Sequence, residues 1–269
     1  IRNVKQEQID TLNATEKLRF ALGPDIPFEL LAVRPWTGHC VVAERYQNGR
    51  VFLAGDAAHL NWPAGGFGMN TGVGDAVDIG WKLAAVLQGW GGAKLLDSYT
   101  PERKPIAMIN VNEAAEMRAN YDKETPFSGM ISDDSDVGHE LREKARAAIM
   151  RTRAKEFQHD SAGIEFGYRY ENSPICVADG TPPPDLDHGL YVPSTWPGVR
   201  APHAWLKDGR SALDLFGKGF VLLTFSETDT STITEAAKEA GMPLEVVALK
   251  DTKVHHTYER DLVLVRPDG

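Results

Sequence analysis

The chain has 269 residues, enough for about two domains, and 42% of them are hydrophobic and 25% charged, as in an ordinary globular protein. The formal net charge of -9 argues against nucleic acid as a partner, because proteins that bind nucleic acid normally present a basic face. No apolar run approaches the roughly 18 residues of a transmembrane helix, so we expect no membrane partner. The two cysteines, Cys40 and Cys176, are far apart, which favours a cytoplasmic protein in which both are small buried apolar side chains.

Both ends of the sequence have features of a piece of a longer chain. The first residue is Ile1 rather than Met, and a predicted strand near the other end runs into Asp268-Gly269. Asp-Gly is a strong hairpin-turn signal, so we expect a partner strand to follow it.

The first part of the chain predicts one helix and three strands. A helical pattern over 1–23 ends at a Gly-Pro break, and apolar clusters predict strands at 29–35 and 39–46. The dipeptide Asn48-Gly49 is a turn signal. The segment 50–54 that follows it is almost continuously apolar, which indicates a strand covered on both faces.

A long, mostly buried helix is expected over 70–88. Its predicted buried stripe consists of Val73, Val77, Gly80, Ala84 and Leu87. Asp78 and Lys82 lie four residues apart on the narrower polar side, where they can pair.

Further helices and a change of composition follow. Thr100 is a suitable N-cap for the next helix, with Pro101 at the first helical position, and Pro105 is expected to distort that helix. The charged stretch 137–158 predicts a solvated amphipathic helix. The prolines 182–184 mark a stiff boundary, after which strand, helix, strand and strand indicate a small α/β unit.

The most informative stretch is "AGDAAHLNWPAGGFGMNTGVGDA", residues 54–76. It places Asp56 at the end of the predicted buried strand, where α/β proteins bind ligands and where a carboxylate can accept hydrogen bonds from sugar hydroxyls. The loop 63–68 has few side chains, so its backbone can approach a flat ligand. Met69 and Asn70 then open a helix whose free N–H groups attract negative charge. A flat, polyol-linked cofactor that becomes anionic, such as reduced flavin, fits these features.

The segments "GRVFLAGDAAH", "PAGGFGMNTGVGDAVDIGWKLAAVL" and "LLDSYTPERKPIA" closely resemble the second flavin-binding motif of the single-component FAD-dependent aromatic hydroxylases. This is the group around para-hydroxybenzoate hydroxylase and phenol hydroxylase. The ordered agreement comprises Gly55, Asp56, His59, Pro63, Gly65, Gly68, Asn70, Asp75, Trp81, Lys82 and Arg103. The later segments "GYRYENSPI" and "PGVRAPHAWLKDGRSALDLFGKGFVLLTF" resemble the link and the thioredoxin-like C-terminal domain of the phenol-hydroxylase and polyketide-hydroxylase branch.

The resemblance implies an α/β (α+β) fold in three parts. Residues 1–49 would end the sheet of a substrate-binding domain, 50–180 would form the C-terminal part of the FAD-binding domain, and 181–269 would be a truncated thioredoxin-like domain. Trp36 could face substrate in the first part, although a core position is the expected one. The third part lacks the CxxC of a thioredoxin, so we expect an interaction or packing module.

The resemblance also implies roles for the cofactor-binding residues. Asp56 would contact the ribityl or pyrophosphate part of FAD, and Pro63 would lie near the reactive edge of the ring. The backbone of the loop would approach the ring and offer N–H groups to its pyrimidine carbonyl, through Gly65, Gly66, Gly68, Met69 and Asn70. His59 is expected to be structural rather than a proton carrier, and Arg103 to pair within the fold.

The function implied is an FAD-dependent, NAD(P)H-consuming monooxygenase that hydroxylates a phenolic or polyketide substrate through a flavin hydroperoxide. Its partners would be a small aromatic substrate, O2 and the N-terminal dinucleotide-binding half of the same protein, and a homodimer fits the family. The G-x-G-x-x-G motif of that half does not occur in the sequence. No catalytic residue can be named from this sequence, and the adjacent His255 and His256 are expected to be surface residues rather than metal ligands.

Two alternatives stay open at this point. One is another flavin oxidoreductase with the same FAD module, such as an epoxidase, a Baeyer–Villiger oxygenase or a reductase. The other is a non-catalytic interaction protein built on a degenerate flavin fold.

Overall fold

The computed structural model describes residues 14–34, 36–124, 129–155 and 161–269. It divides into two compact units, Ile1–Gly38 and His39–Gly269, each of which is described by itself. Throughout the described part, no helix is long and apolar enough to cross a membrane. Mixed helices and strands confirm the predicted α/β (α+β) class.

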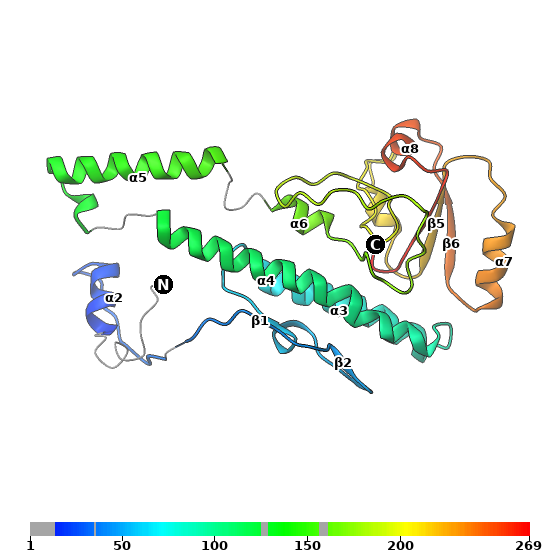
Figure 1. The fold of residues 1–269 in the computed structure, drawn as a ribbon, viewed down its shortest axis with the longest axis horizontal. Coiled ribbons are helices and arrows are strands. Elements are labelled where there is room, and N and C mark those ends of the chain that lie inside the picture. The colour runs from blue at the N-terminus through cyan, green and yellow to red at the C-terminus, as the bar shows by residue number, and fades with distance from the viewer. Residues whose placement is uncertain (1–13, 35, 125–128, 156–160) are drawn as a thin grey trace. The chain divides into compact units, whose positions relative to one another are not determined.

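The first unit contains helix α2 (Ala14–Leu22) (Figure 1). This helix agrees with the end of the one predicted over 1–23, whose first 13 residues lie outside the described part. The strand predicted at 29–35 is wrong over 29–34, because no described strand of this unit pairs with it. Trp36 is 62% exposed, so the expected core position is also wrong.

Four very short strands open the second unit. β1 (Val41–Val42) pairs with β4 (His59–Leu60), and β2 (Gln47–Asn48) pairs with β3 (Val51–Phe52), both antiparallel. The predicted turn joins β2 to β3, with Gly49 at a φ of 59° that favours glycine. The strands predicted at 39–46 and 50–54 are therefore much shorter than expected, and Val51 is 65% exposed rather than covered.

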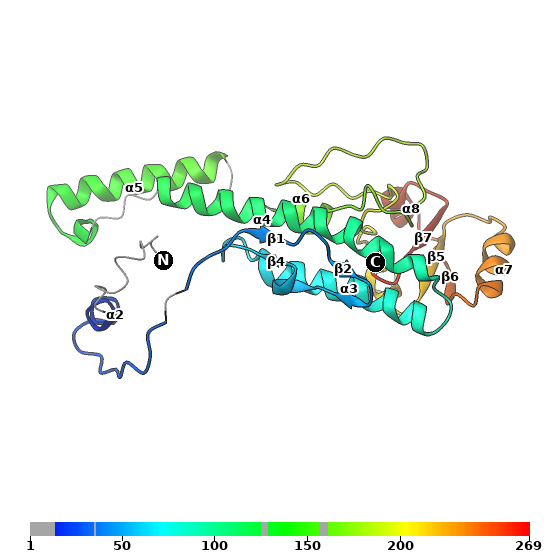
Figure 2. The same cartoon turned by 60° about the horizontal axis from the view of Figure 1, so that its bottom comes forward.

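Two long helices, α3 (Phe67–Leu87) and α4 (Tyr99–Glu124), lie side by side (Figures 1 and 2). They are joined through the 3-10 segment η2 (Ala93–Ser98). The helix α4 continues through Pro105, and the hydroxyl of Thr100 accepts the backbone N–H of Tyr46 at 3.3 Å. The predicted helix exists, but Thr100 does not serve as its N-cap.

The face of α3 that packs against α4 contains buried polar side chains, and three residues of the predicted buried stripe are exposed instead. Val73, Val77 and Leu87 are 54%, 47% and 84% exposed. The buried contact combines hydrogen bonds and ion pairs with an apolar cluster that contains Ile79 of α3 and Tyr99 and Ala107 of α4. We call this contact the polar seam: Thr71, Asp75, Asp78 and Lys82 of α3 with Glu102, Arg103 and Asn110 of α4.

Further elements lead to a small C-terminal sheet. The segments η3 (Gly129–Ser132), α5 (Asp136–Lys155) and α6 (Ala162–Gly167) come first, and α5 is the predicted charged helix. A 3-10 turn, η4 (Ala212–Leu215), precedes β5 (Phe220–Thr224). The strand β5 pairs in parallel with β6 (Leu244–Ala248) and antiparallel with β7 (Leu262–Val265).

Two helices accompany this sheet, α7 (Ser231–Glu239) and α8 (Thr252–Tyr258). The second was not predicted. It supplies Val254 and Tyr258 to the core around Leu223. Its start is marked by Asp251, whose carboxylate accepts the N–H groups of Lys253 and Val254 at 3.0 and 3.4 Å.

Removing this cap tests the assignment. The substitution Asp251→Ala leaves two helix N–H groups without their acceptor, so we expect the free energy of unfolding to fall by about 1 kcal/mol. Urea denaturation followed by circular dichroism measures the change. Glu239→Ala, at an exposed position, is the control and should stay within about 0.5 kcal/mol of wild type.

Candidate cofactor site

The turn between β3 and β4 carries Asp56. Residues Gly55–Ala57 form a single 3-10 turn, η1, in which Gly55 has a φ of 57°. The side chain of Asp56 lies at the surface. An exposed carboxylate at this turn is free to accept hydrogen bonds from a ligand outside the chain.

The glycine loop needs its glycines for two different reasons. Gly65 and Gly66 have φ values of 69° and 75°, which L side chains rarely adopt. A Cβ on Gly65 would also lie 2.5 Å from the ring of Phe67, which is buried beneath the loop. Pro63 is exposed at the start of the loop. Glycine at position 65 therefore allows the loop backbone to pack closely against Phe67, and Gly66 supplies the positive φ just before α3.

The N-terminus of α3 is open. Its N-cap, Gly66, offers no side chain, so the N–H groups of Phe67, Gly68 and Met69 have no acceptor within the helix. The amide of Asn70 donates to the carbonyl of Gly66 at 2.9 Å. A Cβ on Gly68 would meet no atom within 4 Å. Free N–H groups and the helix dipole at an unobstructed surface make a place for negative charge, and they fit a reduced flavin ring.

Asp75 is the buried acid of this region. Its Oδ2 accepts the N–H of Gly55 at 3.0 Å and the Nε2 of His59 at 2.8 Å, and its Oδ1 accepts the Nε of Arg103 at 2.9 Å. Burial alone would raise its pKa, but the hydrogen bond from His59 and the charge of Arg103 outweigh burial and lower the pKa. Arg103 pairs within the fold, as expected. Asp75 was named as part of the motif, but no role was predicted for it. Its contact with Gly55, twenty residues away, cannot be recognised from a local sequence pattern.

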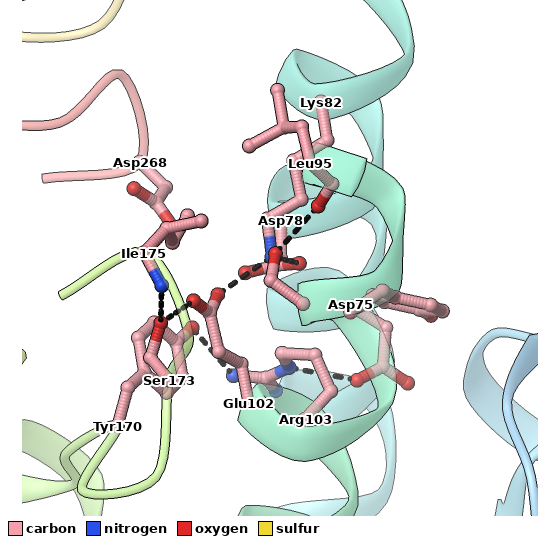
Figure 3. Close-up of polar contacts among 12 residues, drawn as sticks. Asp75, Asp78, Lys82, Leu95, Glu102, Arg103, Tyr170, Ser173, Ile175 and Asp268 are labelled. Atoms are coloured by element: carbon pink, nitrogen blue, oxygen red, sulfur yellow. Dashed lines mark hydrogen bonds and ion pairs between the residues drawn. The ribbon is translucent and has the colours of Figure 1, made fainter. Parts of the chain in front are cut away.

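A second charged group lies one turn further along α3 (Figure 3). The ammonium of Lys82 lies 2.6 Å from both Asp78 and Glu102, and the guanidinium of Arg266, just after β7, binds both oxygens of Glu102 at 2.9 Å. Arg266 also pairs with Asp268 at 2.6 Å. Oxygens of Asp78, Glu102 and Asp268 approach within 4.8 Å of one another, the spacing of metal ligands, but here ammonium and guanidinium groups balance their charge.

Burial has opposite outcomes for the two acids beside Lys82. Desolvation raises the pKa of Asp78 to about 8 despite the nearby ammonium. Desolvation also opposes ionisation of Glu102, but the hydrogen bonds and charge of Arg266 outweigh it and lower that pKa to about 2. Asp78 therefore holds the proton that the two carboxyl groups would otherwise share.

Other residues singled out in the sequence lie away from this region. His255 pairs with Asp261 at 3.1 Å and stacks on Phe225, and His256 is exposed. Both cysteines are free thiols. The expectation of burial is wrong for Cys40, which is exposed, and Cys176 is half-buried.

Two family models match the chain. The FAD binding domain model matches residues 2–114, and the model of the aromatic-ring hydroxylase C-terminal domain matches residues 194–269. The first match contains the open helix, the glycine loop and Asp75, and the second contains the small C-terminal sheet. Residues 2–114 therefore belong to the FAD binding domain family, and residues 194–269 belong to the aromatic-ring hydroxylase C-terminal domain family.

Individual relatives agree with this assignment. The FAD-dependent monooxygenase apdD of Emericella nidulans is 40% identical over 90% of this chain and 40% of its own length. The rebeccamycin biosynthetic enzyme RebC, solved with reduced flavin, is 42% identical with a TM-score of 0.84, over 97% of this chain and 48% of that one. Aklavinone-11 hydroxylase, solved with FAD and aklavinone, is 31% identical with a TM-score of 0.75, over 99% and 48%. The chain spans about half the length of the relatives it matches.

The proton held by Asp78 predicts a pH dependence of stability. An acid whose pKa rises on folding binds its proton more tightly in the folded state, so stability falls as pH rises from the unfolded value of 3.8 toward about 8. One proton contributes up to about 1.4 kcal/mol per pH unit. Between about pH 6 and about pH 8 the free energy of unfolding should drop by on the order of 1–2 kcal/mol more in wild type than in Asp78→Asn, which cannot titrate. Parallel pH dependences in denaturant titrations would contradict the assignment. Glu102 titrates below this range.

Proposed function

We propose that this chain is the FAD-contacting and C-terminal part of an NAD(P)H-consuming monooxygenase that hydroxylates a small aromatic substrate, phenolic or polyketide. The observation that carries the proposal is the uncapped N-terminus of α3 beside the exposed Asp56. This arrangement offers hydrogen-bond acceptors for a polyol and donors for an anion on one surface. The FAD-bound relatives and the two matched families support it.

Different residues of the chain contact different parts of FAD. Asp56 accepts hydrogen bonds from the ribityl or pyrophosphate part, and Pro63 lies near the reactive edge of the ring. The loop glycines Gly65 and Gly66 allow close approach of the backbone. Gly68, Met69 and Asn70 line the start of α3 and direct N–H groups to the pyrimidine end.

FAD, when bound, supplies the redox chemistry with O2, and NAD(P)H supplies the electrons. The partial positive charge of the α3 N-terminus favours the anionic reduced ring by roughly 0.3–1 kcal/mol, or up to about 2 kcal/mol where the end is partly buried. The loop and helix orient the ring and cover part of its surface from water. The residues that deprotonate the substrate are not assigned to this chain.

The exposed apolar face of α3 supports the proposal that a dinucleotide-binding half of the same protein completes the site. Met69, Val73 and Val77 lie along one side of the helix and are 78%, 54% and 47% exposed. Contiguous exposed apolar side chains of this kind commonly mark a contact surface. The relatives are about twice the length of this chain, which is enough for such a half. A cytoplasmic location and a homodimer stay predictions.

The activity is tested on the complete protein. It should be isolated with FAD and should oxidise NADH or NADPH faster when a phenolic or polyketide aromatic compound is added. Mass spectrometry after reaction under isotopically labelled O2 should find one labelled oxygen atom in the product. A protein that retains FAD but only passes electrons to an added acceptor would favour the reductase alternative, and one without FAD would favour the non-catalytic one.

The cofactor contacts are tested by two substitutions. Asp56→Ala should weaken FAD binding about 10- to 100-fold, since a hydrogen bond to a charged group is worth about 1.5–3 kcal/mol. Gly68→Val should weaken it at least as much. Space around the Gly68 Cβ is open in the chain itself, so any obstruction must come from the ligand. Fluorescence titration of the flavin-free protein measures both dissociation constants.

Matched controls exist for both substitutions. Gly92→Val adds the same side chain at another glycine with open space and a φ of -69°, and Asp97→Ala removes another exposed acid. Both control variants should bind FAD within about threefold of wild type. Wild-type affinity in Asp56→Ala and Gly68→Val would show that FAD does not lie on this surface.

A further inference from the structure

We propose that Asp75 is a positioning residue for the cofactor: its carboxylate holds the turn that carries Asp56 in register with the N-terminus of α3. The inference rests on the proposed function, because FAD is the ligand that would span both groups. It assigns to Asp75 a role exerted through Gly55, without contact with the cofactor itself.

Three segments converge on this one carboxylate. The N–H of Gly55 comes from the η1 turn, the imidazole of His59 from β4, and the guanidinium of Arg103 from α4. The side chains of Asp75, His59 and Arg103 are 0%, 0% and 2% exposed. A buried acid with donors from three directions fixes the position of each donor, because moving one would leave a buried polar group unpaired.

The turn is also pressed directly onto α3. A Cβ on Gly72 would lie 3.0 Å from the Cα of Gly55, so the two glycines allow backbone-to-backbone contact. Asp75 lies one helical turn after Gly72, and its carboxylate accepts a hydrogen bond from the N–H of Gly55. These two contacts hold Gly55, and with it the neighbouring Asp56, against the helix that also presents the free N–H groups.

The charge of Asp75 is balanced within the fold. Arg103 pairs with it and is itself held by the hydroxyl of Tyr170 and the carbonyl of Thr71, both at 3.2 Å. Asp75 can therefore hold the turn as a carboxylate without adding an unbalanced negative charge beneath a cofactor that carries phosphates.

The turn contact is tested first in the flavin-free complete protein. Site-resolved hydrogen exchange at the Gly55 amide should become at least about tenfold faster in Asp75→Ala, because its acceptor is lost. Asp78→Ala is the matched control. It removes another buried aspartate, which contacts Lys82 at 2.6 Å one turn further along the same helix and does not touch Gly55, so exchange at Gly55 should stay within about threefold.

The same variants then test positioning. FAD affinity should fall at least about tenfold in Asp75→Ala and stay within about threefold in Asp78→Ala. Asp75→Asn keeps a side-chain oxygen for Gly55 but loses the ion pair with Arg103. The exchange rate at Gly55 and the FAD affinity of Asp75→Asn should both lie between those of wild type and Asp75→Ala. Asp75→Asn replaces Asp75→Ala in the test if the alanine variant does not fold.

The outcomes separate the two proposals. Unchanged Gly55 exchange in the Asp75 variants, or faster exchange with unchanged FAD affinity, overturns the positioning role while leaving the proposed function intact. Equal losses in Asp75→Ala and Asp78→Ala also overturn it, since they would reflect general destabilisation. A wild-type protein that binds no FAD would overturn both proposals.

Discussion

The structure depends on the polar seam between α3 and α4. Charged groups removed from water are costly unless each has a partner, and removing one partner of a buried pair typically costs about 3–5 kcal/mol. Ion pairs at Asp75–Arg103 and Lys82–Glu102 and a hydrogen bond at Thr71–Asn110 can form together in one rotation and one register of the helices. That register leaves Val73 and Val77 of α3 exposed and its glycine-rich start unobstructed.

The seam also explains which parts of the site could be read from the sequence. The existence of α3 and α4, the Asn48-Gly49 turn and the open helix start were predicted from local patterns of apolar residues, glycine and proline. The burial of Val73, Val77 and Leu87 on α3 was predicted wrongly, because an apolar stripe is assumed to face the core of its own chain. Lys82 and Asp78 gave the pattern of a solvated pair, and only Glu102 and Arg266, far away in sequence, show why they are buried.

Strands and short helices were harder to predict for physical reasons. The apolar segments at 29–34 and 39–46 have strand-like composition, but a strand needs a partner for its backbone groups, and composition does not reveal one. The helix α8 has seven residues, too few for a periodic pattern, and its cap Asp251 was not recognised in the sequence. The role of Asp75 was not predicted because its partners come from three separate segments.

The contact of Arg266 has a consequence for the order in which the chain acquires structure during synthesis. Arg266 is separated from Glu102 by 164 positions and from Asp78 by 188. Chains emerge from the ribosome at about 5–20 residues per second, so α3 and α4 wait on the order of ten seconds for this cation. During that interval Glu102 has Lys82 but lacks the guanidinium that binds both of its oxygens. The α3–α4 pair therefore acquires its full set of buried partners only after the segment that contains Arg266 has been made.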